Sequence, residues 1–171
     1  MSGSFKSKLS FGKLWEDNVK EWLESKGYDV ERHTDYDENG MELRQFYVYA
    51  DGQSYPHPDF TVTKNNNENY VEVKAYSSVY RNIFGKVSVN LLNPNEDYLS
   101  IHKYHFDSYL QLARWKEIDT KIIFVDVGNE NWYSENVEKL YKTRVEVSNA
   151  YAPDEFSDYY FWKLSNLKQI R

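Results

Sequence analysis

The sequence contains no cysteine and no long apolar run. The absence of cysteine excludes disulfides, thiolate metal sites and cysteine nucleophiles. No apolar segment approaches the ~20 residues that a bilayer-spanning helix needs, and the first residues lack the apolar core of a signal peptide. These absences predict a cytoplasmic protein without a membrane partner.

Basic residues are also in the minority. The chain has 21 Lys and Arg against 27 Asp and Glu, a formal net charge of −6. This balance argues against a nonspecific nucleic-acid binder, which usually carries a basic surface. It does not exclude a nuclease, because an acidic metal site lowers the total charge and a basic groove can be local.

The residues that are present suffice for one packed domain. The chain has 171 residues, of which 40% are hydrophobic and 18% aromatic. This length is that of one ordinary domain, and no internal repeat, low-complexity segment or linker divides it. We therefore predict a single domain over residues 1–171.

Hydrophobic periodicity predicts an α/β domain with a mixed central β-sheet flanked by helices. The polar segment Thr34–Gly40 and the run Asn65–Asn67 are predicted turns. In chain order, the expected elements are a helix over Leu9–Lys26, strands over Tyr28–His33, Glu42–Ala50, Asp59–Thr63, Tyr70–Tyr76 and Lys86–Asn90, a helix over His102–Glu117, a central strand over Lys121–Val127, a helix over Ser134–Thr143 and a strand over Tyr159–Leu164.

The two strands that flank the Asn run carry acids and a lysine. Alternation places Glu72 and Lys74 on one face of their strand, and a hairpin turn would bring Asp59 alongside. Two nearby carboxylates repel each other unless a cation lies between them. Mg²⁺ takes oxygen ligands and keeps several waters, so two carboxylates suffice to hold it. Alternatively, the three residues form an ordinary solvated sheet face.

This pattern resembles the PD-(D/E)xK nuclease superfamily. Pro58-Asp59 stands for the first half of the motif, and Glu72-Val73-Lys74 stands for the second half. A preceding helix carries an acid, Glu16, as it does in the family.

The resemblance implies the roles of these residues. Asp59 and Glu72 are the expected metal ligands, and the backbone carbonyl of Val73 is a further one. Lys74 is the expected catalytic lysine, and Glu16 is the helix glutamate that assists the site. The alternative for Glu16 is a place at the rim of its helix.

The resemblance also implies a fold. The family has a mixed four-stranded sheet with a helix on each side, in the order αβββαβ. The resemblance covers about residues 9–127. Residues 128–171 form an extension that the resemblance does not explain.

Other candidates are less specific to one role. Arg81 and Lys86, in the segment after the motif, could contact phosphates or lie solvated. Gln111 begins a segment similar to the Gln-x-x-x-Tyr motif of RecB-type exonucleases, with Trp115 where the family has Tyr. We keep it as a DNA-binding candidate beside the alternative of a surface residue.

Histidine and tyrosine candidates have ordinary alternatives. His102 and His105 have the spacing of a zinc pair but lack an obvious third ligand, so exposed or structural histidines are the favoured interpretation. His57 could line the pocket or belong to a turn. Tyr76 could stack on a base or pack locally.

The predicted function is a metal-dependent DNA nuclease. The resemblance implies Mg²⁺, or Mn²⁺ in its place, as cofactor, an endonuclease as the first choice, and a possible homodimer. One alternative is a catalytically inactive nuclease-like domain that binds nucleic acid or a protein partner, and another is RNA as substrate. Restriction, repair, recombination and phage DNA metabolism all use this scaffold, so the pathway stays open.

Overall fold

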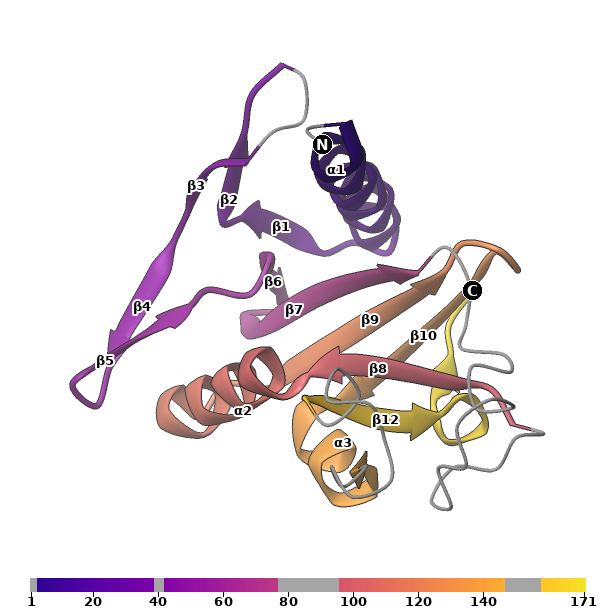
Figure 1. Cartoon of the computed structure of the whole chain (residues 1–171). Coiled ribbons are helices and arrows are strands. Elements are labelled where there is room, and N and C mark those ends of the chain that lie inside the picture. Colours follow the sequence, from indigo (N-terminus) through magenta and orange to yellow (C-terminus); the bar gives the residue numbers. More distant parts are fainter. Residues whose placement is uncertain (1–2, 39–41, 77–95, 147–157) are drawn as a thin grey trace.

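The computed structural model describes residues 3–38, 42–76, 96–146 and 158–171, which form an α/β domain around a mixed six-stranded sheet (Figure 1). The helices are α1 (Gly3–Ser25), α2 (Lys103–Lys116) and α3 (Val137–Thr143), with a short 3-10 helix over Leu164–Asn166. In spatial order, the main sheet contains β1 (Asp29–Arg32), β6 (Phe60–Lys64), β7 (Asn67–Tyr76), β9 (Thr120–Asp126), β10 (Asn131–Asn136) and β13 (Lys168–Gln169). The single α/β domain predicted from the sequence is confirmed.

Smaller sheets surround the main one. A three-stranded sheet contains, in spatial order, β11 (Val145–Glu146), β12 (Tyr159–Lys163) and β8 (Tyr98–His102). Two hairpins stand between β1 and β6 in the chain: β2 (Thr34–Tyr36) with β3 (Glu42–Gln45), and β4 (Tyr47–Ala50) with β5 (Gln53–Pro56).

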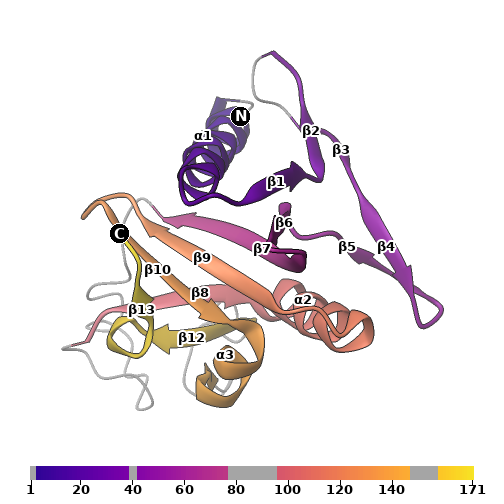
Figure 2. The ribbon, with the colours of Figure 1, turned by 180° about the vertical axis from the view of Figure 1, so that it is seen from behind.

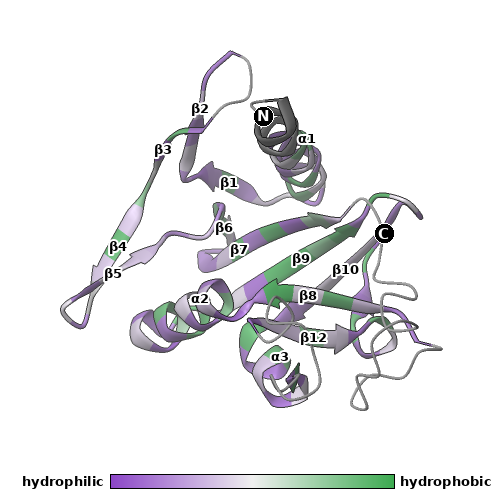
Figure 3. Ribbon diagram, viewed as in Figure 1, coloured by the Kyte–Doolittle hydropathy of each residue, from purple (hydrophilic) through white to green (hydrophobic). Residues whose placement is uncertain are grey.

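The predicted central strand is β9. It pairs in parallel with β7 and antiparallel with β10, while all other pairs in the main sheet are antiparallel. The elements α1, β1, β6, β7, α2 and β9 give the expected αβββαβ order, interrupted by the two hairpins and by β8. Figure 3 shows β9 as largely hydrophobic, as a strand covered on both faces requires.

Helix α1 covers one face of the main sheet. Its inward side chains include Val19 and Leu23, with Trp15 and Trp22 beside them, at the spacing of one helical face. They pack on the sheet residues Val30, Phe60, Val62, Val71, Val73, Ile123, Val125 and Trp132.

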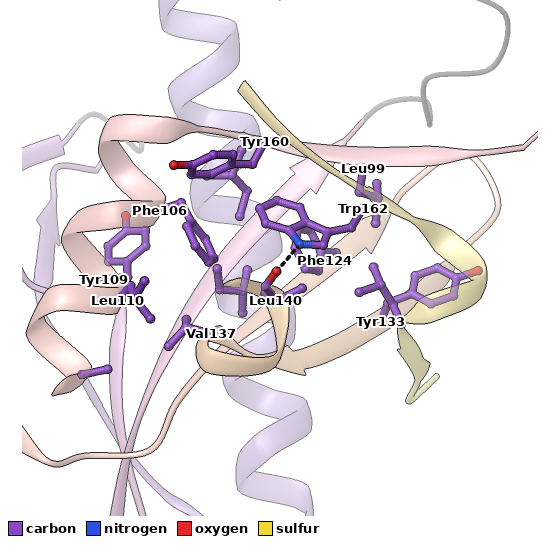
Figure 4. Packing of buried hydrophobic residues seen from close by; sticks show 14 residues of the cluster. Leu99, Phe106, Tyr109, Leu110, Phe124, Tyr133, Val137, Leu140, Tyr160 and Trp162 are labelled. Atoms are coloured by element: carbon purple, nitrogen blue, oxygen red, sulfur yellow. Dashed lines mark hydrogen bonds between the residues drawn. The ribbon is translucent and has the colours of Figure 1, made fainter. Parts of the chain in front are cut away.

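The opposite face is covered by α2, α3 and the three-stranded sheet. Side chains of β9 alternate between the faces, so that Ile122 and Phe124 join this second cluster. Trp162 is fully buried there and donates an indole N–H to the carbonyl of Leu140 at 2.8 Å (Figure 4). The segment predicted as a C-terminal extension therefore contributes to the main core.

The first helix is longer than predicted. It begins at Gly3 rather than at Leu9. No proline interrupts residues 4–9, so the helical backbone continues through them.

The prediction for residues 34–50 was wrong in two places. The polar segment expected to be a turn contains β2, and the expected strand Glu42–Ala50 divides into β3 and β4. Phe46 lies at the division because its N–H donates to the carbonyl of His33, and its carbonyl accepts from the N–H of His57. These bonds tie the ribbon formed by β2–β5 to the main sheet.

The helix predicted over Ser134–Thr143 begins three residues later, at Val137. Its first residues belong to β10, and Asn136 caps α3 by accepting a hydrogen bond from the Glu138 N–H at 2.8 Å. The predicted strand Lys86–Asn90 lies outside the described residues.

The ribbon β2–β5 projects at one side of the molecule, from the region of α1 to that of α2 (Figures 1 and 2). Its β4–β5 end packs on α2, where Tyr55 and Val48 contact Leu112. None of the helices in the described ranges is long and apolar enough to cross a membrane.

Candidate active site

The β6–β7 hairpin brings the two predicted carboxylates together. Asn65 and Asn66 have the positive φ angles of 52° and 62° that a tight hairpin turn needs. The pairing of Phe60 with Val71 then sets Asp59 beside Glu72.

Two hydrogen bonds fix this approach. The backbone N–H of Asp59 donates to Glu72 Oε2 at 3.3 Å, and the N–H of Val73 donates to Asp59 Oδ2 at 2.8 Å. Asp59 Oδ1 accepts no hydrogen bond from the described residues, so one oxygen of this carboxylate is available to a ligand.

Glu72 and Lys74 share the face of β7 that is turned toward α2. Lys74 Nζ lies 2.5 Å from Glu72 Oε1, and Tyr109 of α2 donates its hydroxyl to the same oxygen at 2.6 Å. Glu72 is only 3% exposed, whereas the Lys74 side chain keeps 30% of its surface exposed. The lysine is therefore the member of this group that reaches solvent.

Glu16 comes from α1 and is 7% exposed. Its Oε1 accepts a hydrogen bond from the hydroxyl of Tyr36 at 2.6 Å, and its Oε2 lies 3.8 Å from Nε of Arg32. Both Oε2 and Arg32 Nε are buried and have no hydrogen-bond partner among the described residues. An unsatisfied buried oxygen of this kind needs an explanation, and an ion or water that completes the site is one.

The three carboxylates and the lysine influence one another electrostatically. Burial raises the pKa of Asp59 well above its usual value, and the negative charges of Glu72 and Glu16 raise it further. Burial also raises the pKa of Glu16, with a smaller contribution from Glu72. Burial alone would lower the pKa of Lys74, but Glu72, Tyr109 and Asp59 reverse the effect and raise it well above its usual value. The group has a surplus of negative charge that a cation would relieve.

The residues fit a hard divalent ion. Within the described ranges, no three His, Cys, Asp or Glu side chains are grouped closely enough to cage a metal by themselves. Mg²⁺ needs no such cage, because it is bound through one or two carboxylates and keeps several waters. Asp59 and Glu72 supply two carboxylates of the required type, and Glu16, which interacts with them electrostatically, lies near them without completing a three-carboxylate cage.

Other predicted residues lie outside this group. Gln111 accepts a hydrogen bond from the Tyr55 hydroxyl at 3.1 Å, and Tyr76 donates its hydroxyl to the carbonyl of Ser100. The rings of His102 and His105 are 5.9 Å apart. Arg81 and Lys86 lie outside the described residues.

His57 packs locally beside the candidate site. Its ring lies 3.6 Å from that of His33, which was not singled out in the sequence, and its Nδ1 is 3.0 Å from the carbonyl of Pro58. The Nε2 of His33 is 2.7 Å from the hydroxyl of Thr61. These contacts brace the segment that carries Asp59.

Sequence reasoning missed the partners of the acids: Tyr109, Tyr36 and Arg32. Tyr109 lies three positions after Phe106 and four before Ala113, on the apolar side of its helix, and a buried tyrosine hydroxyl usually needs a hydrogen-bond partner. That requirement pointed to the polar face of β7. No comparable signal existed for Tyr36, because no local pattern indicates that its segment folds back onto α1.

The chain shares its fold with a solved nuclease structure, so the fold that the resemblance implied is confirmed. A solved structure with this fold is Hjc from Archaeoglobus fulgidus, a Holliday junction resolvase from an archaeal hyperthermophile. It superposes with a TM-score of 0.53 at 12% identity, covering 91% of this chain and 86% of that chain.

A nuclease from a fusselovirus was also found, with a TM-score of 0.43 at 13% identity over 98% of this chain and 86% of that one. No protein-family model and no curated protein matches the chain.

Proposed function

We propose that this chain is a divalent-metal-dependent nuclease that hydrolyses phosphodiester bonds in DNA. The observation that carries the proposal is the contact group of Asp59, which immediately precedes β6, with Glu72 and Lys74 of β7. The similarity of fold to a Holliday junction resolvase supports it. Two carboxylates suffice to hold Mg²⁺, and such an ion can assist the hydrolysis of a phosphodiester.

In this proposal each residue has a distinct task. Asp59 and Glu72 bind the metal, Mg²⁺ or Mn²⁺, together with the carbonyl of Val73. The bound ion supplies Lewis-acid chemistry, by which it polarises a phosphoryl oxygen and lowers the pKa of a water. Lys74 provides positive charge where negative charge develops on the phosphorane oxygens. Glu16 orients water beside this group.

The proposal is tested with single-stranded, duplex and branched DNA in the presence of Mg²⁺ or Mn²⁺. Lys74→Ala should lower turnover by about 10²–10³-fold, the typical cost of losing one group that stabilises transition-state charge. Its metal affinity should remain, because both carboxylates stay in place. Asp59→Ala should lose both metal binding and cleavage.

A matched control is Lys163→Ala. Lys163 ends β12, and its Nζ lies 2.6 Å from Oε2 of Glu96. This variant should cleave like the wild type. Equal cleavage by all four proteins would identify a contaminating nuclease and defeat the proposal.

The proposal also concerns the mode of cleavage. We infer endonuclease action on DNA, so closed circular DNA should be linearised or fragmented. Degradation of linear DNA only would identify an exonuclease, and cleavage of RNA alone would identify a ribonuclease.

A homodimer would place two sites on the two strands of a duplex. Sedimentation velocity at several concentrations tests it, with and without duplex DNA. A single monomeric species under all conditions would reject the dimer without affecting the nuclease proposal.

A second candidate function is a nuclease-like domain that binds nucleic acid or a protein without cutting. The net charge of −6 and the ion pair that engages Lys74 with Glu72 favour this alternative. It predicts DNA retention without divalent ions and no cleavage with any of them.

A further inference from the structure

The carboxylate of Glu16 is held by the strands that follow α1 rather than by α1 itself. Tyr36 of β2 donates its hydroxyl to Oε1 at 2.6 Å, and the guanidinium of Arg32 in β1 lies 3.8 Å from Oε2. Arg32 also pairs with Asp17 at 2.6 Å. Glu16 therefore has one oxygen committed to a tyrosine and a neighbouring cation that is shared with another acid.

The two oxygens of Glu16 are unequal as a result. Oε1 has a short, charge-assisted partner, whereas Oε2 is buried and accepts no hydrogen bond from the described residues. Desolvating a carboxylate oxygen without a partner costs free energy. Such a cost is tolerated where a bound ligand repays it, and Glu16 interacts electrostatically with Glu72 and Asp59 of the candidate metal site.

We propose that Tyr36 is a positioning residue of the candidate site, whose hydroxyl fixes the Glu16 carboxylate so that Oε2 stays available to the divalent ion or to a water bound to it. This inference rests on the proposed function, because it assigns a task within the same site. Tyr36 acts through Glu16 and does not itself touch the ion.

Tyr36 links the candidate site to the rest of the ribbon β2–β5. Tyr36 belongs to the ribbon β2–β5, which interrupts the expected order between β1 and β6. At its other end, Tyr55 packs on Leu112 of α2 and bonds to Gln111. Helix α2 in turn carries Tyr109, which bonds to Glu72. The ribbon thus contacts α1, which carries Glu16, and α2, which carries the tyrosine bonded to Glu72 (Figures 1 and 2).

The variant that isolates the hydroxyl is Tyr36→Phe. It keeps the ring that lies 5.7 Å from the Arg32 guanidinium and 5.8 Å from Lys13 Nζ. It removes only the donor to Glu16. The matched control is Tyr49→Phe, on the same ribbon but 73% exposed.

The primary readout is Mn²⁺ affinity of the full chain, measured by titration calorimetry without DNA. Tyr36→Phe should weaken binding by about 10-fold or more, the usual cost of losing a group that orients a metal ligand. On DNA that the wild type cleaves, it should lower kcat with KM unchanged. Tyr49→Phe should match the wild type in both assays.

A double-mutant cycle with Glu16→Gln separates positioning from general stability. If Tyr36 acts through Glu16, adding Tyr36→Phe to Glu16→Gln should change Mn²⁺ affinity by less than 2-fold. A merely structural hydroxyl would lower the urea midpoint and leave Mn²⁺ affinity and kcat at wild-type values, and that result overturns the inference.

Failure of the proposed function gives a different result. A wild-type protein that binds Mn²⁺ but cuts no nucleic acid would reject the nuclease, while a weaker Mn²⁺ affinity in Tyr36→Phe would still support the positioning role. A wild-type protein that binds no Mn²⁺ would overturn both.

Discussion

The hydroxyl of Tyr109 donates to Oε1 of Glu72 at 2.6 Å, which joins α2 to the central strand β7 inside the candidate site. Both side chains are buried, so the bond is shielded from solvent. The same oxygen accepts from Lys74. Glu72 is thereby oriented from the helix and from its own strand at once.

Tyr109→Phe should lower the free energy of unfolding by about 1.5–3 kcal/mol, the cost of removing a hydrogen bond to a charged group. The phenyl ring keeps its packing, so the loss is that of the hydroxyl alone. Urea unfolding of the metal-free protein measures it. Tyr160→Phe is the control, because its hydroxyl bond to Asp107 is longer, at 3.4 Å, and should cost less. Equal losses in both variants would contradict the assigned strength of the Tyr109 bond.

Divalent metal should stabilise the folded protein. At a free Mn²⁺ concentration of 100 times Kd, binding to the native state adds about 2.7 kcal/mol to the free energy of unfolding. Thermal unfolding should therefore shift upward with Mn²⁺ and return on addition of EDTA.

Asp59→Asn should abolish this shift, whereas Glu24→Gln, which changes an exposed acid paired with Lys20, should keep it. A shift of the same size in Asp59→Asn would place the metal elsewhere.

The adjoining histidines His33 and His57 should make the protein less stable in mild acid. Burial lowers the pKa of both His33 and His57 below the usual 6.5, and for His33 the neighbouring His57 adds to the effect. Between the folded value and 6.5 the unfolded chain binds more protons, so the free energy of unfolding falls as pH drops through this window.

His57→Phe keeps a ring against His33 and Tyr70 but removes one of the titrating groups. Its free energy of unfolding should depend less on pH between about pH 7 and pH 5 than that of the wild type. Urea unfolding in a series of buffers measures the two slopes. Parallel slopes would show that His57 is not held neutral by the fold.

The C-terminal segment should unfold together with the rest of the domain. Leu140 of α3 is fully buried and packs with side chains from β9 and α2, so Leu140→Ala should cost about 2–5 kcal/mol. Unfolding should remain a single transition by circular dichroism and by tryptophan fluorescence.

Leu14→Ala serves as the control for this change. Leu14 is 54% exposed, and surface substitutions usually stay within about 0.5 kcal/mol. Two separate transitions, only one of them shifted by Leu140→Ala, would show that residues 128–171 form an independent unit.

The site acids were predictable because each obeys a local rule. Alternation along β7 fixed the face of Glu72 and Lys74, and the Asn run fixed the turn that returns β6 to β7. Val19 and Leu23, four positions apart on one helical face, pack on the sheet and thereby orient α1 and Glu16.

The ribbon was not predictable by the same means. Its strands are short, and their polar and aromatic residues alternate too weakly to separate β3 from β4. The backbone hydrogen bonds of Phe46 with His33 and His57 divide β3 from β4, and these are tertiary contacts. The contact between Tyr36 and Glu16 depends on this fold-back, so no local pattern could reveal it.

The parallel pairing of β7 with β9 has a consequence for how the protein folds. Strand β7 ends at Tyr76 and its parallel neighbour β9 begins at Thr120, 44 positions later in the chain. The intervening crossover must close before these two strands can pair with each other. Closure of such a long connection slows folding. During synthesis, Asp59 and Glu72 leave the ribosome well before β9, the parallel partner of β7. We therefore expect nascent chains to acquire metal affinity only after residue 126 has emerged.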